Sequence, residues 1–284
     1  MFSLVKRNLM LYLRNRSGVF FSLFGAMISF VLYLVFLKQS IKSGWAGLPD
    51  ASQLLDNWLI AGTLTITGIT TSLTALSQMV KDEEQKIDLD LRLTDIGPVA
   101  VRSSYLIAAA TIAFLMQVIV YLVMATYFGF TDSLAFSWTI LPELLLIMVL
   151  SALLATAVNA IIVGMIHSVD SLSKLASLIG TASGFLVGTY VPLGTLPDMA
   201  QFVMKLTPGT YLAALYRQTL MTPKLTDVFA KAPAQLTDFE KMMGVKIEWT
   251  ALLSHGATYW LVIVLLVITA GILTIQSLKK RRFA

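Results

Sequence analysis

The stretch "WLIAGTLTITGITTSLTALSQMVKDEEQKIDLDLRLTDIGP", from Trp58 to Pro98, changes character near its middle. Its first part, about residues 58–79, is apolar and long enough to cross the roughly 30 Å hydrocarbon core of a bilayer as one helix. Its second part alternates charged and aliphatic residues and ends at Gly97-Pro98, a pair that breaks a helix. The stretch therefore predicts a membrane-spanning helix followed by a sizeable polar loop.

The composition of the whole chain extends this interpretation. Of its 284 residues, 57% are hydrophobic and only 13% are charged, whereas soluble domains have about 25% charged residues. Apolar runs of about twenty residues recur along the sequence, so we predict an all-α polytopic membrane protein that forms a single transmembrane domain over residues 1–284. The six predicted transmembrane helices lie at about 17–37, 58–79, 104–128, 139–165, 174–194 and 255–277.

The distribution of basic residues predicts how the chain is inserted. Thirteen Lys and Arg residues lie in the two termini, in the loop at 80–103 and around residues 167–174, against eight in the segments of the other face. By the positive-inside rule, both termini and the 80–103 loop face the cytoplasm. Residues 2–16 place apolar and basic side chains on different sides of a helix, which predicts an N-terminal interfacial helix. The excess of basic residues thus points to anionic membrane lipids as a partner, and not to nucleic acid.

The segment at 192–253 lies on the opposite, extracytoplasmic face and divides in two. Its first half is apolar but is interrupted by Pro192, Pro197 and Pro208, which a continuous helix does not tolerate. We predict a re-entrant helical pair that dips back toward the membrane between the fifth and sixth spans. The second half, 224–250, is charged, and Thr237-x-x-Glu240 predicts a capping box that opens a further helix.

The sequence shows no constellation that would carry catalysis. It has neither a phosphate-binding G-x-x-x-x-G-K-[ST] loop nor an H-E-x-x-H metal pair, and it has no cysteine. His167 and His255 stand far apart at span ends, and Glu143 follows Pro142 as in an ordinary helix start. We therefore expect no catalytic residue, no metal and no coupling-ion site in the spans, so that transport would draw its energy from another subunit.

Two spans carry small or hydroxyl-bearing residues at helical spacing. The hydroxyl face of the second span either packs against a neighbouring helix or lines a polar pathway. The glycine face of the fifth span has the four-residue spacing that lets two helix backbones approach, and its partner lies either in this chain or in a second copy. The hydroxyl face comprises Thr63, Thr67, Thr70 and Thr74, and the glycine face comprises Gly180, Gly184 and Gly188.

The charged loop at 80–103 has two interpretations. A cytoplasmic loop is usually polar, so this one can be merely a solvated connection. Its size and its interspersed aliphatic residues favour a docking surface, because they offer both apolar contacts and charges to a cytoplasmic partner. The charged residues assigned to this surface are Lys81, Asp82, Glu83, Glu84, Lys86, Asp88, Asp90, Arg92 and Asp95.

At this point the chain resembles the integral-membrane permease of the type-2 ABC exporters. The resemblance is carried by the amphipathic segment before the first span, by "KDEEQK" followed by "LTDIGP", and by "YVPLGTLPDMAQFVMKLTPGTYLAALYRQ" after the fifth span. The last stretch looks like the extracytoplasmic re-entrant pair of that family, and Lys86 stands where a glycine is common. The residues at typical positions of the re-entrant segment are Tyr190, Pro192, Pro197, Pro208 and Arg217.

The resemblance implies a division of labour. Two permease chains, identical or homologous, would form the pathway, and two separate ABC ATPase subunits would hold ATP and Mg²⁺ beneath them, while this chain holds no cofactor. The 80–103 loop would contain the coupling helix that docks in the ATPase, and spans two and five would face the pathway. The expected function is ATP-driven export across a bacterial plasma membrane of a hydrophobic or amphipathic substrate, such as a drug, a lipid or an antimicrobial peptide.

A second interpretation comes from another class of protein. In it the chain is a non-transporting immunity or sensory protein of the membrane that binds a peptide through its extracytoplasmic segment. Co-purification with an ATPase separates the two interpretations.

Overall fold

The computed structural model describes residues 1–40, 51–92, 97–135, 137–230 and 233–282. These residues form an all-helical fold, in which an isolated bridge between Glu248 and Leu252 is the only β-type pairing. The long helices are α5 (Ala51–Glu84), α7 (Gly97–Asp132), α8 (Leu141–Val163), α9 (Val169–Leu186), α11 (Pro208–Val228) and α13 (His255–Arg282). The shorter ones are α1 (Phe2–Arg14), α2 (Arg16–Ser22), α3 (Phe24–Leu32), η1 (Tyr33–Leu37), α6 (Ile87–Arg92), η2 (Leu193–Thr195), α10 (Asp198–Lys205) and α12 (Pro233–Met242).

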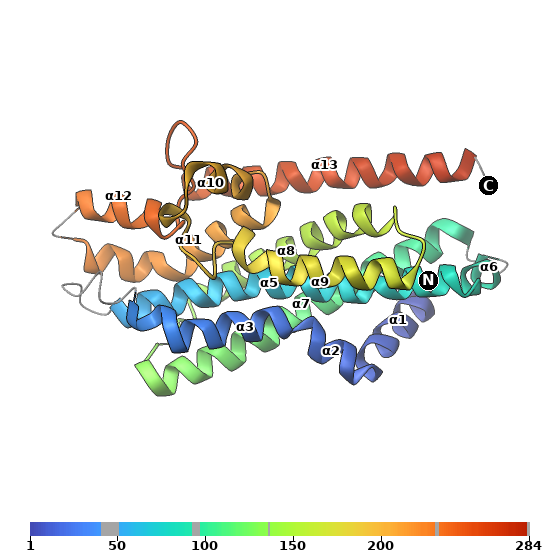
Figure 1. The fold of residues 1–284 in the computed structure, drawn as a ribbon, viewed down its shortest axis with the longest axis horizontal. Helices are drawn as coiled ribbons and strands as arrows, with labels where there is room; N and C mark the ends of the chain where they lie inside the picture. The colour runs from blue at the N-terminus through green and yellow to red at the C-terminus, as the bar shows by residue number, and fades with distance from the viewer. Residues whose placement is uncertain (41–50, 93–96, 136, 231–232, 283–284) are drawn as a thin grey trace.

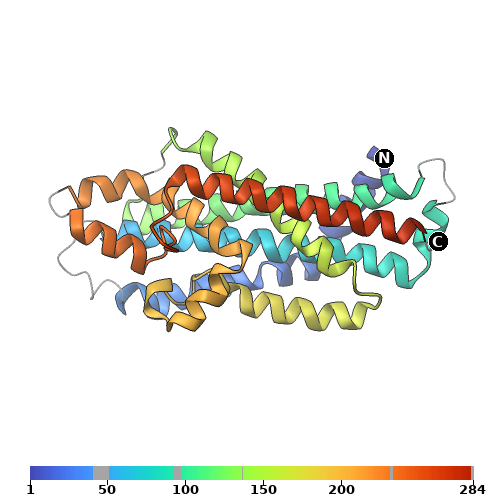
Figure 2. The same ribbon diagram turned by 90° about the horizontal axis from the view of Figure 1, so that it is seen from above.

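The long helices run along one common axis (Figure 1). The start of α1, the end of α13 and α6 lie at one end of this bundle, and α12 lies at the other. The view turned by 90° shows the same two ends (Figure 2). We call them the α6 end and the α12 end.

Helix α5 occupies the centre of the bundle. In its apolar window 83% of the residues are buried, against 17% for α13, which lies at the periphery. It packs against α3, α7, α8, α9 and α11, and its Trp58, Leu59 and Leu64 belong to the main apolar cluster with no exposed surface. Most of its hydroxyl groups bond to a carbonyl one turn back, as Thr67 does to Thr63 at 2.8 Å. Most hydroxyl groups of this buried helix therefore have partners within the helix itself.

By length and composition, fewer helices qualify as membrane spans than the sequence predicts. Among the described residues, α5, α7, α8 and α13 qualify as candidate spans. The predicted first span consists of two helical pieces, Arg16–Ser22 and Phe24–Ser40, which are bent by 42° and form one broken span or a re-entrant loop. The predicted fifth span corresponds to α9, which carries Asp170 and Lys174 and is not among the candidates. The all-helical membrane fold is confirmed, whereas the count of six is not.

The start of the chain leaves the bundle axis (Figure 1). Asn15 separates α1 from α2, and its side-chain oxygen accepts a hydrogen bond from the N–H of Gly18 at 3.0 Å. Helix α1 then packs on α7 and buries Leu4, Asn8 and Tyr12, which recur every four residues. Phe2 and Leu13 stay exposed on its other side.

Helix α8 begins as the sequence predicts. Pro142 lies in its first turn and Glu143 follows. Glu143 has a further contact that the sequence does not reveal, because its Oε1 lies 2.7 Å from Nε2 of His255 at the start of α13. This pair joins α8 to α13.

Pro192, Pro197 and Pro208 each stand at the start of a helix. Pro197 precedes α10, and Pro208 lies in the first turn of α11. Helix α11 continues for 21 residues through Pro223, so it is not a short helix, and the predicted re-entrant course is not confirmed. The predicted capping box at Thr237 is wrong: α12 already begins at Pro233, so Thr237 lies inside the helix.

Gly194 marks a close approach between η2 and the end of α12. A Cβ atom at this position would lie 2.6 Å from the Cα atom of Met242, and a backbone atom cannot rotate away. We expect Gly194→Ala to force the two elements apart and to lower the free energy of unfolding by about 1–3 kcal/mol, measured by denaturant unfolding in detergent. Gly271→Ala is the matched control, because a Cβ there meets nothing within 4 Å. An equal loss in both variants would contradict the close approach.

Candidate functional site

The charged loop of the sequence forms a helical turn at the α6 end. Helix α5 continues past its apolar part to Glu84, and the chain turns at Lys86 into α6. Lys86 has φ +62°, the left-handed region in which glycine is favoured. Asp95 lies outside the described residues. The element predicted to dock a partner is thus a short helix that packs against both α5 and α7.

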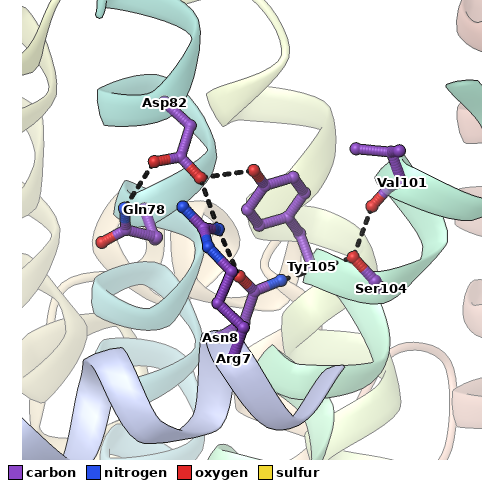
Figure 3. A network of polar contacts seen from close by, with 7 residues as sticks. All are labelled: Arg7, Asn8, Gln78, Asp82, Val101, Ser104 and Tyr105. Carbon is purple, nitrogen blue, oxygen red and sulfur yellow. Dashed lines mark hydrogen bonds and ion pairs between the residues drawn. The ribbon is translucent and has the colours of Figure 1, made fainter. Parts of the chain in front are cut away.

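The carboxylate of Asp82, at the end of α5, is fully buried. The hydroxyl of Tyr105 donates to its Oδ2 at 2.5 Å and Nη1 of Arg7 at 2.8 Å, while Nε2 of Gln78 donates to its Oδ1 at 2.7 Å. Figure 3 shows these donors converging on Asp82 from α1, α5 and α7. Asp82 is therefore an internal anchor that ties α1 to the bundle.

The partner cation, Arg7, is held on two sides. Its Nη1 also donates to Oδ1 of Asn8 at 3.0 Å, and Nδ2 of Asn8 donates to Oγ of Ser104 at 3.4 Å (Figure 3). The hydrogen bond to Asp82 raises the pKa of Arg7 above its ordinary value, against the opposing effect of burial. The guanidinium of Arg7 is therefore positively charged and lies against the carboxylate of Asp82.

The two acids after Asp82 also have contacts within the chain. Oε2 of Glu84 accepts a hydrogen bond from the N–H of Val169 at 3.3 Å. Val169 is the first residue of α9, where a carboxylate complements the helix dipole. Oε1 of Glu83 lies 3.9 Å from Nδ1 of His167 in the connection between α8 and α9. The turn before α6 is thereby joined to α9 as well as to α1.

Only part of the predicted docking surface faces outward. Lys81, Lys86 and Asp90 are exposed, and 51% of the surface of Leu89 on α6 is accessible. Asp88 is half-buried, and Arg92 is the last residue of α6. The docking assignment stays a prediction, but Asp82 lies behind that surface.

The hydroxyl face of α5 lies inside the chain. Thr63, Thr67 and Thr70 are buried and Thr74 is half-buried. Three of these hydroxyls donate to carbonyls of their own helix, whereas the hydroxyl of Thr63 has no hydrogen-bond partner among the described residues. The face packs against neighbouring helices, and its assignment to a pathway stays a prediction.

The glycine face divides among three different environments. The ring of Tyr190 covers Gly184, where a Cβ atom would lie 2.1 Å from Cζ of the tyrosine. Gly188 follows the end of α9 at φ +68°, a conformation that terminates helices. A Cβ at Gly180 would meet nothing within 4 Å. Of the three glycines, Gly180 is therefore the one that leaves room for the predicted contact with another helix.

The residues assigned to the re-entrant segment gather toward the α12 end. Pro192 precedes η2, two residues after the buried Tyr190. Arg217 of α11 has 1% of its surface exposed. Its side chain donates to carbonyl oxygens of Val187, Gly188 and Gly244.

These features define the class of the protein. An all-helical bundle with four or five candidate membrane-spanning helices among the described residues is typical of an integral-membrane protein. The sequence profile of the ABC-2 type transporter family matches residues 1–221. The chain belongs to this family: it is a multi-pass transporter permease domain, a non-catalytic transmembrane subunit. Permeases of this family generally pair with ABC ATPase subunits. The comparison with curated proteins found no match.

The burial of Asp82 gives a first prediction for this site. Asp82→Ala leaves three donors without their acceptor, so we expect the free energy of unfolding to fall by about 3–5 kcal/mol, measured by denaturant unfolding in detergent. Arg7→Met should also destabilise strongly, because it leaves the fully buried carboxylate of Asp82 without its cation. Asp90→Ala removes an exposed acid of α6 and should stay within about 0.5 kcal/mol of the wild type. If Asp82→Ala lowers the free energy of unfolding no more than Asp90→Ala does, Asp82 is not an anchor.

The backbone at Lys86 gives a second prediction. Lys86→Gly removes the Cβ that the left-handed conformation disfavours and should raise the free energy of unfolding by about 0.5–1 kcal/mol. Lys86→Val should lower it, because a β-branched residue fits this region worse. Thermal unfolding of the three proteins side by side measures the order. Glycine and valine variants of equal stability would show that the turn has another conformation.

Proposed function

We propose that this chain is the permease subunit of an ATP-driven exporter, spanning a bacterial plasma membrane six times with both termini in the cytoplasm. The α6 end then faces the cytoplasm, and the spans are the broken helix from Arg16 to Ser40, α5, α7, α8, α9 and α13. Helix α10 and the start of α11 form the re-entrant pair. The positive-inside bias supports this orientation, because the basic termini and α6 lie at one end of the bundle.

Two ABC ATPase subunits hold ATP and Mg²⁺, and each docks on helix α6 of one permease chain. The observation that carries this proposal is the construction of the α6 end. The partly exposed helix α6 packs on α5 and α7, and the end of α5 is tied through Asp82 to α1 and through Glu84 to α9. A force applied to α6 therefore reaches several helices at once. Leu89, exposed between Lys86 and Asp90, offers an apolar contact surrounded by charges, as partner surfaces do.

A second permease chain, identical or homologous, pairs along α9. The free face at Gly180 admits a close neighbour, and Leu178 and Phe185 of the same helix are 65% and 50% exposed. On α1, Phe2 and Leu13 enter the lipid surface, with the exposed Lys6 and Arg14 near anionic headgroups.

The substrate passes between the two permeases and is hydrophobic or amphipathic, such as a drug, an antimicrobial peptide or a lipid. This class is supported by the exposed side chains of α10, where Met199, Phe202 and Val203 are apolar and Asp198 is charged. Phe202 and Val203 of α10 are 47% and 46% exposed. A strongly charged substrate would find few complementary groups on this flank.

Docking is tested with Leu89→Glu. The tagged chain is purified in mild detergent, and the ABC ATPase that accompanies it is quantified together with its ATPase activity. A buried charge at the centre of an apolar contact should reduce co-purification and stimulation about tenfold or more. The amount of chain in the membrane should not change. Met199→Glu, on α10 at the far end and 76% exposed in the wild type, should leave the ATPase bound.

The two parts of the proposal fail in different ways. If no ABC ATPase accompanies the wild-type chain, the exporter assignment is wrong and the peptide-binding alternative is favoured. If the ATPase binds the wild type and Leu89→Glu equally, the exporter assignment stands and docking at α6 is wrong.

A further inference from the structure

The guanidinium of Arg217 is buried near the α12 end without an acidic partner. Its Nη2 donates to the carbonyl oxygens of Gly188 at 2.7 Å and Val187 at 3.2 Å, and its Nη1 donates to that of Gly244 at 3.1 Å. Burial lowers the pKa of Arg217, and no carboxylate in the described part of the chain opposes this effect. A buried cation is costly unless its charge is compensated. The compensation must therefore come from the backbone.

The three carbonyl oxygens belong to the C-terminal ends of two helices. Val187 and Gly188 directly follow α9, and Gly244 follows α12. Each helix ends on a glycine in the left-handed conformation, with φ +68° at Gly188 and +65° at Gly244. Two helix ends of the same geometry thus face one guanidinium.

The hydrogen bonds around the two glycines are also the same. The N–H of Thr189 donates to the carbonyl of Gly184, and that of Val245 to the carbonyl of Glu240, both at 2.9 Å. This is the Schellman ending of a helix, in which the chain turns away and the last carbonyls remain available. Each helix end carries roughly half a negative charge, so two ends together offset about one positive charge.

A third element meets the guanidinium from the centre of the bundle. The ring of Trp58, on α5, has its centre 5.0 Å from the guanidinium carbon of Arg217, within the range of a cation–π contact. Nε1 of the same Trp58 donates to the carbonyl of Met243 at 2.7 Å. Trp58 therefore binds both the cation and the end of α12.

We propose that Arg217 is an electrostatic clasp that holds the α12 end of the protein closed by joining the ends of α9 and α12 to α5 and α11. This inference does not depend on an ATPase or on a substrate. The family profile ends at residue 221, so the contribution of α12 comes from outside the matched region. The charged segment after α11 is on this view part of the closure.

Arg217→Met distinguishes a clasp from ordinary packing. Methionine keeps a long, flexible, apolar side chain but has neither the charge nor the donors. If packing alone held this end together, such a replacement would be tolerated, as apolar replacements of buried charges often are. If the clasp holds it, three buried carbonyls lose their donors and two negative helix ends face each other.

The absence of cysteine from the sequence allows a local measurement. Thr189→Cys places a thiol beside the clasp, at a fully buried position that packs on Gly62. Ser104→Cys places a thiol at the α6 end, at a position with 1% exposure. Each single-cysteine protein, with and without Arg217→Met, is embedded in nanodiscs and labelled with a membrane-impermeant maleimide, which reaches both faces.

We expect Arg217→Met to speed the labelling of Thr189→Cys about tenfold or more, the change produced by a local opening that is easier by roughly 1.4 kcal/mol. Ser104→Cys should stay protected. Arg217→Lys keeps the charge but not the planar fork and should give an intermediate rate. Gln218→Met is the matched control, because Gln218 is the next buried residue and Nε2 of its side chain bonds Val245 and Thr258. It should leave Thr189→Cys protected.

Three results would overturn the clasp. One is unchanged labelling of Thr189→Cys in the Arg217→Met background. Another is an equal acceleration at Ser104→Cys, which would mean that the whole fold is lost. The third is equal acceleration by Gln218→Met, which would mean that any loss of a buried donor in this region opens it.

Discussion

The burial of α5 on all sides is the constraint on which the rest of the structure depends. A helix in this position meets protein along most of its apolar part, so its buried polar groups need partners inside the chain. Along its middle, most threonine and serine hydroxyls meet this requirement within the helix itself, and Thr63 is an exception among the described residues. At its two ends the polar groups are larger, and their partners lie on other helices.

The two ends solve the problem of buried charge in different ways. At the α6 end, the carboxylate of Asp82 is paired with a cation, Arg7, which is partly solvated, so the pair tolerates burial at modest cost. At the α12 end, Arg217 has helix ends in place of a carboxylate. An ion pair attracts from many directions, but a carbonyl oxygen accepts best near the plane of its peptide group, along its lone pairs. The second arrangement therefore specifies geometry more strictly than the first.

The sequence predicts the helices well because apolar length is a direct consequence of the bilayer. The predicted span at 139–165 corresponds to α8 at Leu141–Val163. The prediction for α5 stops near residue 79 because hydropathy detects only the apolar part, whereas the helix continues through charged residues to Glu84. A local sequence pattern predicts a helix start wrongly where a stronger start signal comes earlier in the chain. Thr237-x-x-Glu240 has the sequence of a capping box, but the helix already begins at Pro233.

The candidate site is less predictable, because burial of a charge is a tertiary property. Nine charged residues of the loop look alike in sequence, and only the structure separates Asp82, with no exposed surface, from the exposed Asp90. One signal was available: Asn8 stands between Leu4 and Tyr12 on the side of α1 that packs on α7. A polar residue among buried apolar ones indicates a polar partner across the interface. For the glycine face, spacing alone does not show that a tyrosine of the same chain covers Gly184.

The continuity of α5 decides how movement at one end can reach the other. Asp82 and Trp58 lie on the same unbroken helix of 34 residues, about 36 Å apart along its axis at 1.5 Å per residue. The helical pair Arg16–Ser22 and Phe24–Ser40 is different, since it bends by 42° and contains a π-helical turn at Tyr33–Leu37. A displacement of α5 as one body at the α6 end would also displace Trp58. The hydrogen bond from Trp58 to Met243, at 2.7 Å, and the bonds from Arg217, at 2.7–3.2 Å, depend on alignment.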